Sequence, residues 1–375
     1  MLQQVKTILT SRTETSTMND RVAELVESSR EVLQDVCIEN GAIVAANSDK
    51  EYYPDDVANY RFVWPRDAAF TLYALDIIGE EEQEERFYDW LMERAEGFED
   101  SGVIYHRYST NGPRDTDFGH QFQPDQAAAL LWCILETNEE LDDRQEKIIH
   151  LLADGLWSQW DEENFHSATH DLWEEREAHP DMKENFSYTL ATSSEALYLA
   201  AERMNEQKWF KTAEQIRERL EEHKAERDGK TYYPRTYGEV VDETVDACSL
   251  GLVWPFNVVQ RDEKLENTVE MIEEHLMIDE GVMRYSGDMY DGIIHHTKHL
   301  KKGAGAWPLL TFWYSIALHE LGQEEKANDV FDKQVEQIDG KYIPEQKFSR
   351  DRQGIEPLAW SHSMFLIAAE KLDRI

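Results

Sequence analysis

Residues 61–91, RFVWPRDAAFTLYALDIIGEEEQEERFYDWL, show the pattern that decides the fold. Apolar residues recur at helical spacing over 67–79 and again, among many acidic residues, over 81–97. Asp67 is of a residue type that favours the start of a helix, and Gly79 is of one that favours its end. The stretch therefore predicts two helices that are joined by a short turn.

The same arrangement recurs along the whole chain of 375 residues. Short links alternate with long connections, and a helix follows each long connection at intervals of roughly 58 residues. The repeat is one of architecture, because the letters themselves do not repeat. Helical spacing predicts twelve helices, near 20–38, 67–79, 81–97, 123–137, 142–160, 187–205, 207–226, 245–258, 262–276, 305–321, 323–338 and 357–373.

Six long connections of dissimilar sequence, near 39–66, 98–122, 161–186, 227–244, 277–304 and 339–356, separate the helix pairs. An open solenoid usually repeats its loops, so the dissimilarity favours a closed ring. We predict an all-α fold, an (α/α)6 barrel of six inner and six outer helices. Residues 1–19 are expected to be a flexible N-terminal segment, and residues 20–375 the barrel domain. Antiparallel neighbours would bring the six connections to one mouth, where a pocket is expected.

The formal net charge is −39, and the acidic residues are spread along the chain in short runs. Such a charge repels phosphates, so neither nucleic acid nor an anionic membrane surface is an expected partner. The spread favours a salt-adapted acidic surface over an acidic tail, and it predicts an origin in a halophilic archaeon. The sequence leaves the oligomeric state open.

The chain carries no sign of export or of membrane insertion. It has no signal-peptide pattern near its start and no apolar run that approaches the roughly 18 residues of a membrane span. Cys37, Cys133 and Cys248 are far apart, and no CxxC motif occurs, which is typical of reduced thiols. We therefore predict a cytoplasmic protein.

A histidine run, His295-His296-x-x-His299, is the main candidate for a metal site. A metal site needs several ligands that converge on one point, and no cysteine or carboxylate pattern accompanies these histidines. No glycine-rich phosphate loop is visible either. The sequence therefore predicts neither a metal nor a cofactor.

The long connections are rich in aromatic, arginine and carboxylate residues, which are the groups that bind sugars. Hydrolysis of a glycosidic bond needs two carboxyl groups, one protonated and one that acts as base or nucleophile. Glu345 stands out, because few other acids lie near it, and a carboxyl beside Trp173 could have its pKa raised by desolvation. Residue chemistry alone leaves the pair open among Asp67, Asp117, Asp171, Glu174, Glu175, Asp288 and Glu345.

The motifs RFVWPRDAAF, GHQFQPDQAAALLW, DLWEER, GVMRY and PEQ occur in this order over residues 60–365. In this order and spacing they resemble glycoside hydrolase family 15, the family of glucoamylases with glucodextranase-like and trehalase-like members. The resemblance implies an (α/α)6 barrel and hydrolysis with inversion at the anomeric carbon.

The resemblance also implies roles for single residues. Glu174 would be the general acid and Glu345 the general base. Arg66 and Asp67 would bind hydroxyls of the non-reducing-end glucose, and Arg284 would reach the sugars at the cleaved bond. Glu175 would support the site through hydrogen bonds, although it could instead be only another surface acid. The remaining implied sugar contacts are Tyr60, Trp64, Gln123, Asp125, Trp173 and Trp307.

The expected activity follows from this resemblance. It is exo-acting release of β-glucose from the non-reducing ends of soluble α-glucans or maltooligosaccharides. The alternatives are trehalase-like or glucodextranase-like hydrolysis of another α-glucoside, and a non-catalytic oligosaccharide-binding barrel. Inversion predicts a gap of roughly 6.5–9.5 Å between the two carboxyl groups, which leaves room for a water. Phe118, His120 and Phe122 stand where the family often has tryptophan, which puts contacts beyond the cleaved bond in doubt.

Overall fold

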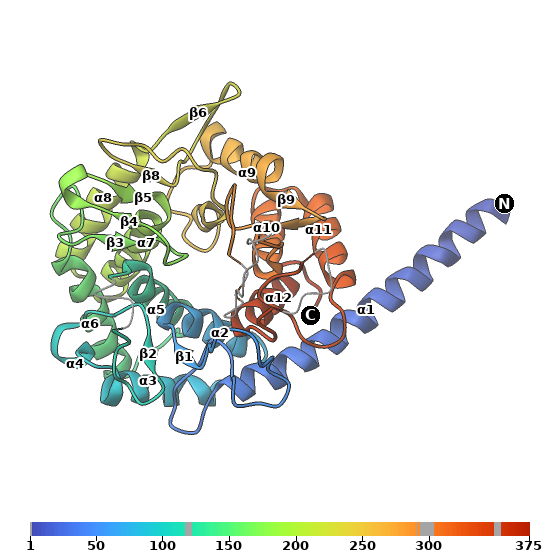
Figure 1. The fold of residues 1–375 in the computed structure, drawn as a ribbon, viewed down its shortest axis with the longest axis horizontal. Coiled ribbons are helices and arrows are strands. Elements are labelled where there is room, and N and C mark those ends of the chain that lie inside the picture. The colour runs from blue at the N-terminus through green and yellow to red at the C-terminus, as the bar shows by residue number, and fades with distance from the viewer. Residues whose placement is uncertain (1, 117–121, 291, 293–303, 349–353) are drawn as a thin grey trace.

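The computed structural model describes residues 2–116, 122–290, 292, 304–348 and 354–375. Its helices form two concentric rings (Figure 1). Each element of the inner ring contacts the next, and the last contacts the first, so the ring is closed. The inner ring consists of α2 (Pro65–Ile77), α5 (Pro124–Thr137), α7 (Ser187–Met204), the 3-10 helix η2 (Ala247–Leu252), α10 (Pro308–Glu320) and α12 (Ala359–Lys371).

The outer ring packs against the inner one. Over residues 18–36 of the first helix and along the other five, the outer helices bury one stripe and expose the rest, as expected for helices with water on one side. Its members are α1 (Leu2–Val36), α3 (Glu82–Arg94), α6 (Asp143–Ser158), α8 (Gln207–Glu221), α9 (Glu263–Leu276) and α11 (Glu324–Glu336). Two short helices, α4 (Phe98–Ser101) and η1 (Pro180–Met182), lie in the connections. The predicted (α/α)6 barrel is confirmed.

Two of the predicted helices differ from the structure. The helix expected at 245–258 is only the six-residue η2. Gly251 lies so close to Tyr188 that a Cβ would come within 2.7 Å of its ring, and Pro255 cannot continue a helical hydrogen-bond ladder. At the other end, α1 continues back to Leu2 instead of starting near residue 20. The flexibility of residues 1–19 stays a prediction.

Aromatic rings fill the axis of the inner ring. Phe70 of α2 contacts Trp132, Trp254, Trp313 and Trp360, with ring centroids 5.2–6.3 Å apart. The inner helices are apolar over nearly their whole circumference, because they pack on the axis as well as on the outer ring. The barrel is therefore a packed core, and any pocket must lie at one of its ends.

Three inner helices begin in the same way. Pro65, Pro124 and Pro308 each occupy a first helical position, where the missing N–H costs nothing and the fixed φ suits a helix. The residues that precede two of these prolines are Trp64 and Trp307, and both lie 6% exposed. At α2 and α10, this start places a buried tryptophan at the mouth end of the helix.

Short antiparallel strand pairs tie the connections together at the mouth. Two pairs join different connections: β1 (Phe62–Val63) with β2 (Tyr108–Ser109), and β5 (Asn185–Phe186) with β8 (Thr236–Tyr237). The other pairs are hairpins within one connection. They are β3 (Thr169–His170) with β4 (Glu177–Ala178), β6 (Ala225–Arg227) with β7 (Lys230–Tyr232), and β9 (Met277–Ile278) with β10 (Gly281–Val282).

The described part of the chain includes no helix that is both long and apolar enough to cross a bilayer. Cys37, Cys133 and Cys248 are free thiols. The predicted halophilic origin and the predicted cytoplasmic location stay predictions.

Candidate active site

A cavity of about 630 Å³ opens at the mouth of the barrel, within the usual range for small-ligand sites. Five of the six long connections contribute to its lining, and the fourth, 227–244, contributes no residue. Ten of the twelve predicted site residues line it: Tyr60, Trp64, Arg66, Asp67, Trp173, Glu174, Glu175, Arg284, Trp307 and Glu345.

Glu174 lies in the tight turn that the β3–β4 hairpin closes. Its φ is +60°, a left-handed conformation that non-glycine residues adopt only when their surroundings enforce it. The indole N–H of Trp64 donates a hydrogen bond of 2.6 Å to Oε1. Burial raises the pKa of the Glu174 carboxyl to about 7, against the opposing charges of Arg66 and Arg107. The group can therefore hold a proton at neutral pH.

Glu345, from the sixth connection, is 2% exposed. The hydroxyl of Tyr60 donates a 2.9 Å hydrogen bond to Oε1, and it also pairs with the hydroxyl of Tyr290. A Cβ at Gly292 would lie 3.0 Å from Oε2, so a larger residue at this position would crowd the carboxylate. Burial raises the pKa of Glu345 to about 7, and the Tyr60 hydrogen bond and the charge of Arg284 oppose the rise.

Arg66 lies on the floor of the cavity between two carboxylates. Its guanidinium donates to Asp125 at 3.0 Å and to Asp67 at 3.1 Å, and it sits 5.0 Å from the centre of the Trp360 ring. Burial raises the pKa of Asp67, although the charge of Arg66 opposes the rise. Asp67 lies in the first turn of α2 and does not cap it, because Trp64 holds the N-cap position.

The structure does not bring Gln123 and Asp125 to the cavity. Both are fully buried at the start of α5, and neither is a lining residue. Asp125 holds Arg66, and the amide of Gln123 donates a 2.6 Å hydrogen bond to the carbonyl of Asp171. Asp125 therefore contacts a lining residue, whereas Gln123 contacts Asp171, which precedes the lining residues Leu172–Glu175.

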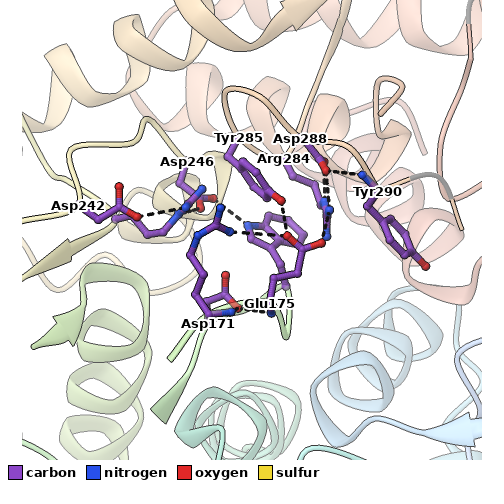
Figure 2. A network of polar contacts seen from close by, with 11 residues as sticks. Asp171, Glu175, Asp242, Asp246, Arg284, Tyr285, Asp288 and Tyr290 are labelled. Atoms are coloured by element: carbon purple, nitrogen blue, oxygen red, sulfur yellow. Dashed lines mark hydrogen bonds and ion pairs between the residues drawn. The ribbon is translucent and has the colours of Figure 1, made fainter. Parts of the chain in front are cut away.

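Arg284 and Glu175 belong to one polar network (Figure 2). Arg284 donates to Asp288 at 2.7 and 2.6 Å and to Glu175 at 2.8 Å, while the hydroxyl of Tyr285 donates to the other oxygen of Glu175. Burial alone would raise the pKa of Glu175, but the charge of Arg284 and these hydrogen bonds bring it below its usual value. Glu175 is thus paired with Arg284 and Tyr285, and its supporting role in the site stays a prediction.

Two tryptophans form an aromatic wall of the cavity. The rings of Trp173 and Trp307 lie 5.8 Å apart, and the guanidinium of Arg284 lies 5.3 and 5.2 Å from their centres. Tryptophan faces pack well against the C–H surfaces of sugars, while a buried arginine offers donors to hydroxyls.

The sequence analysis did not name nine of the nineteen lining residues, among them Arg107 and Tyr290. Arg107 lies 4.8 Å from the centre of the Phe62 ring and 5.2 Å from that of Trp64, and it donates to Asp115 at 2.6 Å. Its flanking aromatics in YHRY (105–108) were the available signal. Tyr290 follows the GVMRY motif closely, but nothing in the letters shows that it pairs with Tyr60 of another connection.

Some predicted features lie outside the described residues. They are the candidate carboxylate Asp117, the departures Phe118 and His120, and the histidine run 295–299. Within the described ranges, no group of three or more histidine, cysteine, aspartate or glutamate side chains is arranged to hold a metal ion.

An (α/α)6 barrel whose mouth holds two buried carboxyl groups among tryptophans and arginines defines a class, the glycoside hydrolases. Within that class, the chain belongs to glycosyl hydrolases family 15, whose family model matches residues 30–370.

Curated relatives agree with this assignment. An uncharacterized glycosyl hydrolase of Methanocaldococcus jannaschii is 27% identical, over 95% of this chain and 57% of the relative. A trehalase of Thermoplasma volcanium is 26% identical, over 84% of this chain and 52% of its own length. An isomaltose glucohydrolase of Kribbella flavida is 24% identical, over 94% and 93%. The chain thus spans just over half the length of the first two relatives.

Solved structures show the same fold. A wild-type glycosidase superposes with a TM-score of 0.76 at 24% identity, over 96% of this chain and 99% of the other. A bacterial glucoamylase in complex with acarbose gives 0.69 at 20% identity, over 93% and 55%.

Proposed function

We propose that the protein is an inverting, exo-acting α-glucosidase that releases β-glucose from soluble α-glucans or maltooligosaccharides. The observation that carries the proposal is the pair of carboxyl groups, Glu174 and Glu345. They come from the third and sixth connections, line one cavity, and each has a pKa raised to about 7. Near neutral pH one carboxyl group of such a pair can be protonated and act as the acid, while the other is ionised and acts as the base.

Glu174 acts as the general acid. Its Oε1 accepts the indole N–H of Trp64, so the other oxygen carries the proton. This proton passes to the glycosidic oxygen while the bond from the anomeric carbon to that oxygen breaks. The rest of the glucan leaves as an alcohol, and Glu174 is left as a carboxylate beside Arg66 and Arg107.

Glu345 acts as the general base. One of its oxygens accepts the hydroxyl of Tyr60, and the other, next to Gly292, accepts a proton from water. The water oxygen forms the new bond to the anomeric carbon on the face opposite the leaving group. The product is therefore the β-anomer, and one proton has moved from water to Glu345.

The closed floor of the cavity supports exo-action. Aromatic rings around Phe70 fill the barrel axis, and Trp360 joins that cluster while it also lines the cavity. A glucan can thus enter only through the mouth, with one end first. Arg66 and Asp67, at the floor, offer a donor and an acceptor to the hydroxyls of that terminal glucose.

The proposal is tested by glucose release from maltotriose, isomaltose and trehalose, at low and high salt. Proton NMR should show β-glucose as the first product, and Glu174→Gln and Glu345→Gln should both remove turnover. First release of α-glucose would overturn inversion. Binding of these sugars without turnover would identify an oligosaccharide-binding barrel instead.

A second candidate is hydrolysis of isomaltose. The similarity to the isomaltose glucohydrolase of Kribbella flavida spans 94% of this chain and 93% of the relative, which is nearly the whole of both. The same three sugars separate the candidates, because the specificity constant kcat/KM would be highest for isomaltose. Trehalose as the best substrate would instead favour the likeness to the trehalase.

A further inference from the structure

The turn that carries Glu174 needs support from outside itself. The left-handed conformation of Glu174 is unfavourable for a residue with a side chain, and it persists only where neighbouring groups hold it. Glu174 lines the cavity, and hydrogen bonds from the residues on either side of it hold its turn.

One side of the turn is held by Asp171. Its carboxylate accepts the backbone N–H groups of Glu175 at 2.8 Å and Arg176 at 3.1 Å, and its carbonyl accepts that of Glu174 at 3.1 Å. Gln123 of α5 fixes the same carbonyl. The start of the turn is thereby attached to the inner ring.

The other side is held through the side chain of Trp173. Its indole N–H donates a 2.9 Å hydrogen bond to Oδ1 of Asp246, which also accepts the N–H of Cys248 at 3.0 Å. Arg235 donates to Oδ2 at 2.7 Å. Asp246, labelled in Figure 2, is 2% exposed and lies at the start of η2. It is not among the lining residues of the cavity.

We propose that Asp246 is a positioning residue for the general acid, because it holds Trp173 and so fixes the turn that carries Glu174. The proposal rests on the proposed function. Through Arg235, which pairs with Asp246, it also gives the fourth connection, which supplies no lining residue, a part in the reaction.

The ion pair of Asp246 and Arg235 is connected to the residues on both sides of Glu174, which are Trp173 and Glu175. Arg235 lies 4.4 Å from the centre of the Tyr285 ring, and the hydroxyl of Tyr285 donates to Glu175. The Arg235 side chain is 1% exposed, as is that of Asp246, so this ion pair is shielded from salt. One buried pair thus contacts Trp173 directly and Glu175 through Tyr285.

The experiment compares two substrates that differ in their need for an acid. Maltotriose needs a proton on its leaving oxygen, whereas fluoride leaves α-D-glucosyl fluoride without one. Asp246→Ala should lower kcat on maltotriose by about 10–100-fold, because misplacement of a catalytic group by about 1 Å costs about that much. Its kcat on the fluoride should stay within about threefold of wild type, as no acid is needed.

Asp242→Ala is the matched control. Asp242 also pairs with Arg235, at 3.2 Å, but it is half-exposed and the structure gives it no hydrogen bond to Trp173. Both rates of this variant should stay near wild type. Glu174→Gln is the reference for complete loss of the acid. It should lose maltotriose turnover and keep most of the rate on the fluoride.

Trp173→Phe covers the case in which Asp246→Ala does not fold, because it removes the same hydrogen bond and leaves Asp246 paired with Arg235. Because Trp173 also lines the cavity, both rates of this variant should fall, and the ratio of the maltotriose rate to the fluoride rate is compared with that of wild type. This ratio should fall about 10–100-fold, and Asp246→Ala added to Trp173→Phe should lower it little further. Equal losses on both substrates, or an unchanged maltotriose rate, overturn the inference alone. A wild type inactive on all glucosides, or Glu174→Gln losing both rates equally, overturns the proposed function and the inference with it.

Discussion

The third and the sixth connections each carry one carboxyl group of the site, but the chain holds them by different means. Side chains fix the turn around Glu174: Trp64, Asp171 and, through Trp173, Asp246. Backbone hydrogen bonds fix the segment around Glu345, whose N–H donates to the carbonyl of Ile355 at 2.9 Å.

Further contacts strengthen the sixth connection. Lys347 and Ala306 exchange two backbone hydrogen bonds, of 2.7 and 3.1 Å. From α12, Ser361 donates to the carbonyl of Pro344 at 2.8 Å, and the ring of His362 accepts the N–H of Ile343 at 2.9 Å. Backbone hydrogen bonds thus carry more of the support at the base than at the acid. Substitutions near Glu345, apart from those at Tyr60, Ser361 and His362, should therefore be tolerated better than substitutions near Glu174.

The largest expected effect is the loss of turnover when either carboxyl group is replaced, and a second substrate distinguishes the role of one group from that of the other. Glu174→Gln and Glu345→Gln should each lower kcat on maltotriose by about 10²–10⁴-fold, because each removes a proton-transfer group. On α-D-glucosyl fluoride only Glu345→Gln should stay inactive, since attack by water still needs the base. Calorimetric binding of maltotriose to both variants should be retained. Equal behaviour of the two on the fluoride would contradict the assignment of roles.

The pH dependence of kcat/KM should show a narrow optimum near pH 7. Both pKa values are raised to about 7, so the rate should fall by about tenfold per pH unit on each side. On the acid side Glu345 gains a proton and stops acting as base; on the basic side Glu174 loses the proton that it must donate. A profile from pH 5 to 9 checks this, and Glu174→Gln, followed on the fluoride, should lose the basic limb only.

The support of the sixth connection should weaken in acid. Burial lowers the pKa of His362 to about 3, and its neutral ring is bonded to Ser29 and to the N–H of Ile343. The unfolded chain, with a histidine pKa of about 6.5, binds a proton that the folded chain does not, so stability is lost as pH falls from about 6.5 toward 3. At pH 5 the loss from this group should be roughly 2 kcal/mol. Urea unfolding at pH 7 and pH 5 measures it, and His362→Gln should reduce the difference between the two pH values.

The smallest expected effect concerns the space behind the base. Gly292→Ala places a Cβ about 3.0 Å from Oε2 of Glu345 at a φ of +67°, and kcat should fall by about tenfold as the carboxylate shifts. Gly287→Ala is the control, because its φ is +82° and nothing lies within 4 Å of its Cβ. Both variants should lose about 1 kcal/mol of stability from backbone strain. An equal loss of kcat in both would show that strain alone acts.

Helical spacing predicted the barrel, because a period of 3.6 residues survives in any helix with an apolar side. It was wrong at η2, where Gly251 packs closely on Tyr188. These residues are distant in sequence, and a pattern read from neighbouring letters does not include such a contact. Motif resemblance predicted most of the lining, yet it did not tell which polar residues face the cavity. The inner helices are buried on all sides, so nothing in the letters distinguishes Asp67, which lines the cavity, from Asp125, which lies beneath it.

Each arginine of the cavity is matched by nearby carboxylates: Arg66 by Asp67, Arg107 by Asp115, and Arg284 by Asp288. The chain as a whole carries a formal charge of −39. Sugars carry no charge, and a neutral molecule is neither steered nor repelled by the field of the protein. The rate at which an uncharged sugar binds should therefore not depend on the charge of the outer surface. That charge can change, with salt or by mutation, without a change in this association rate.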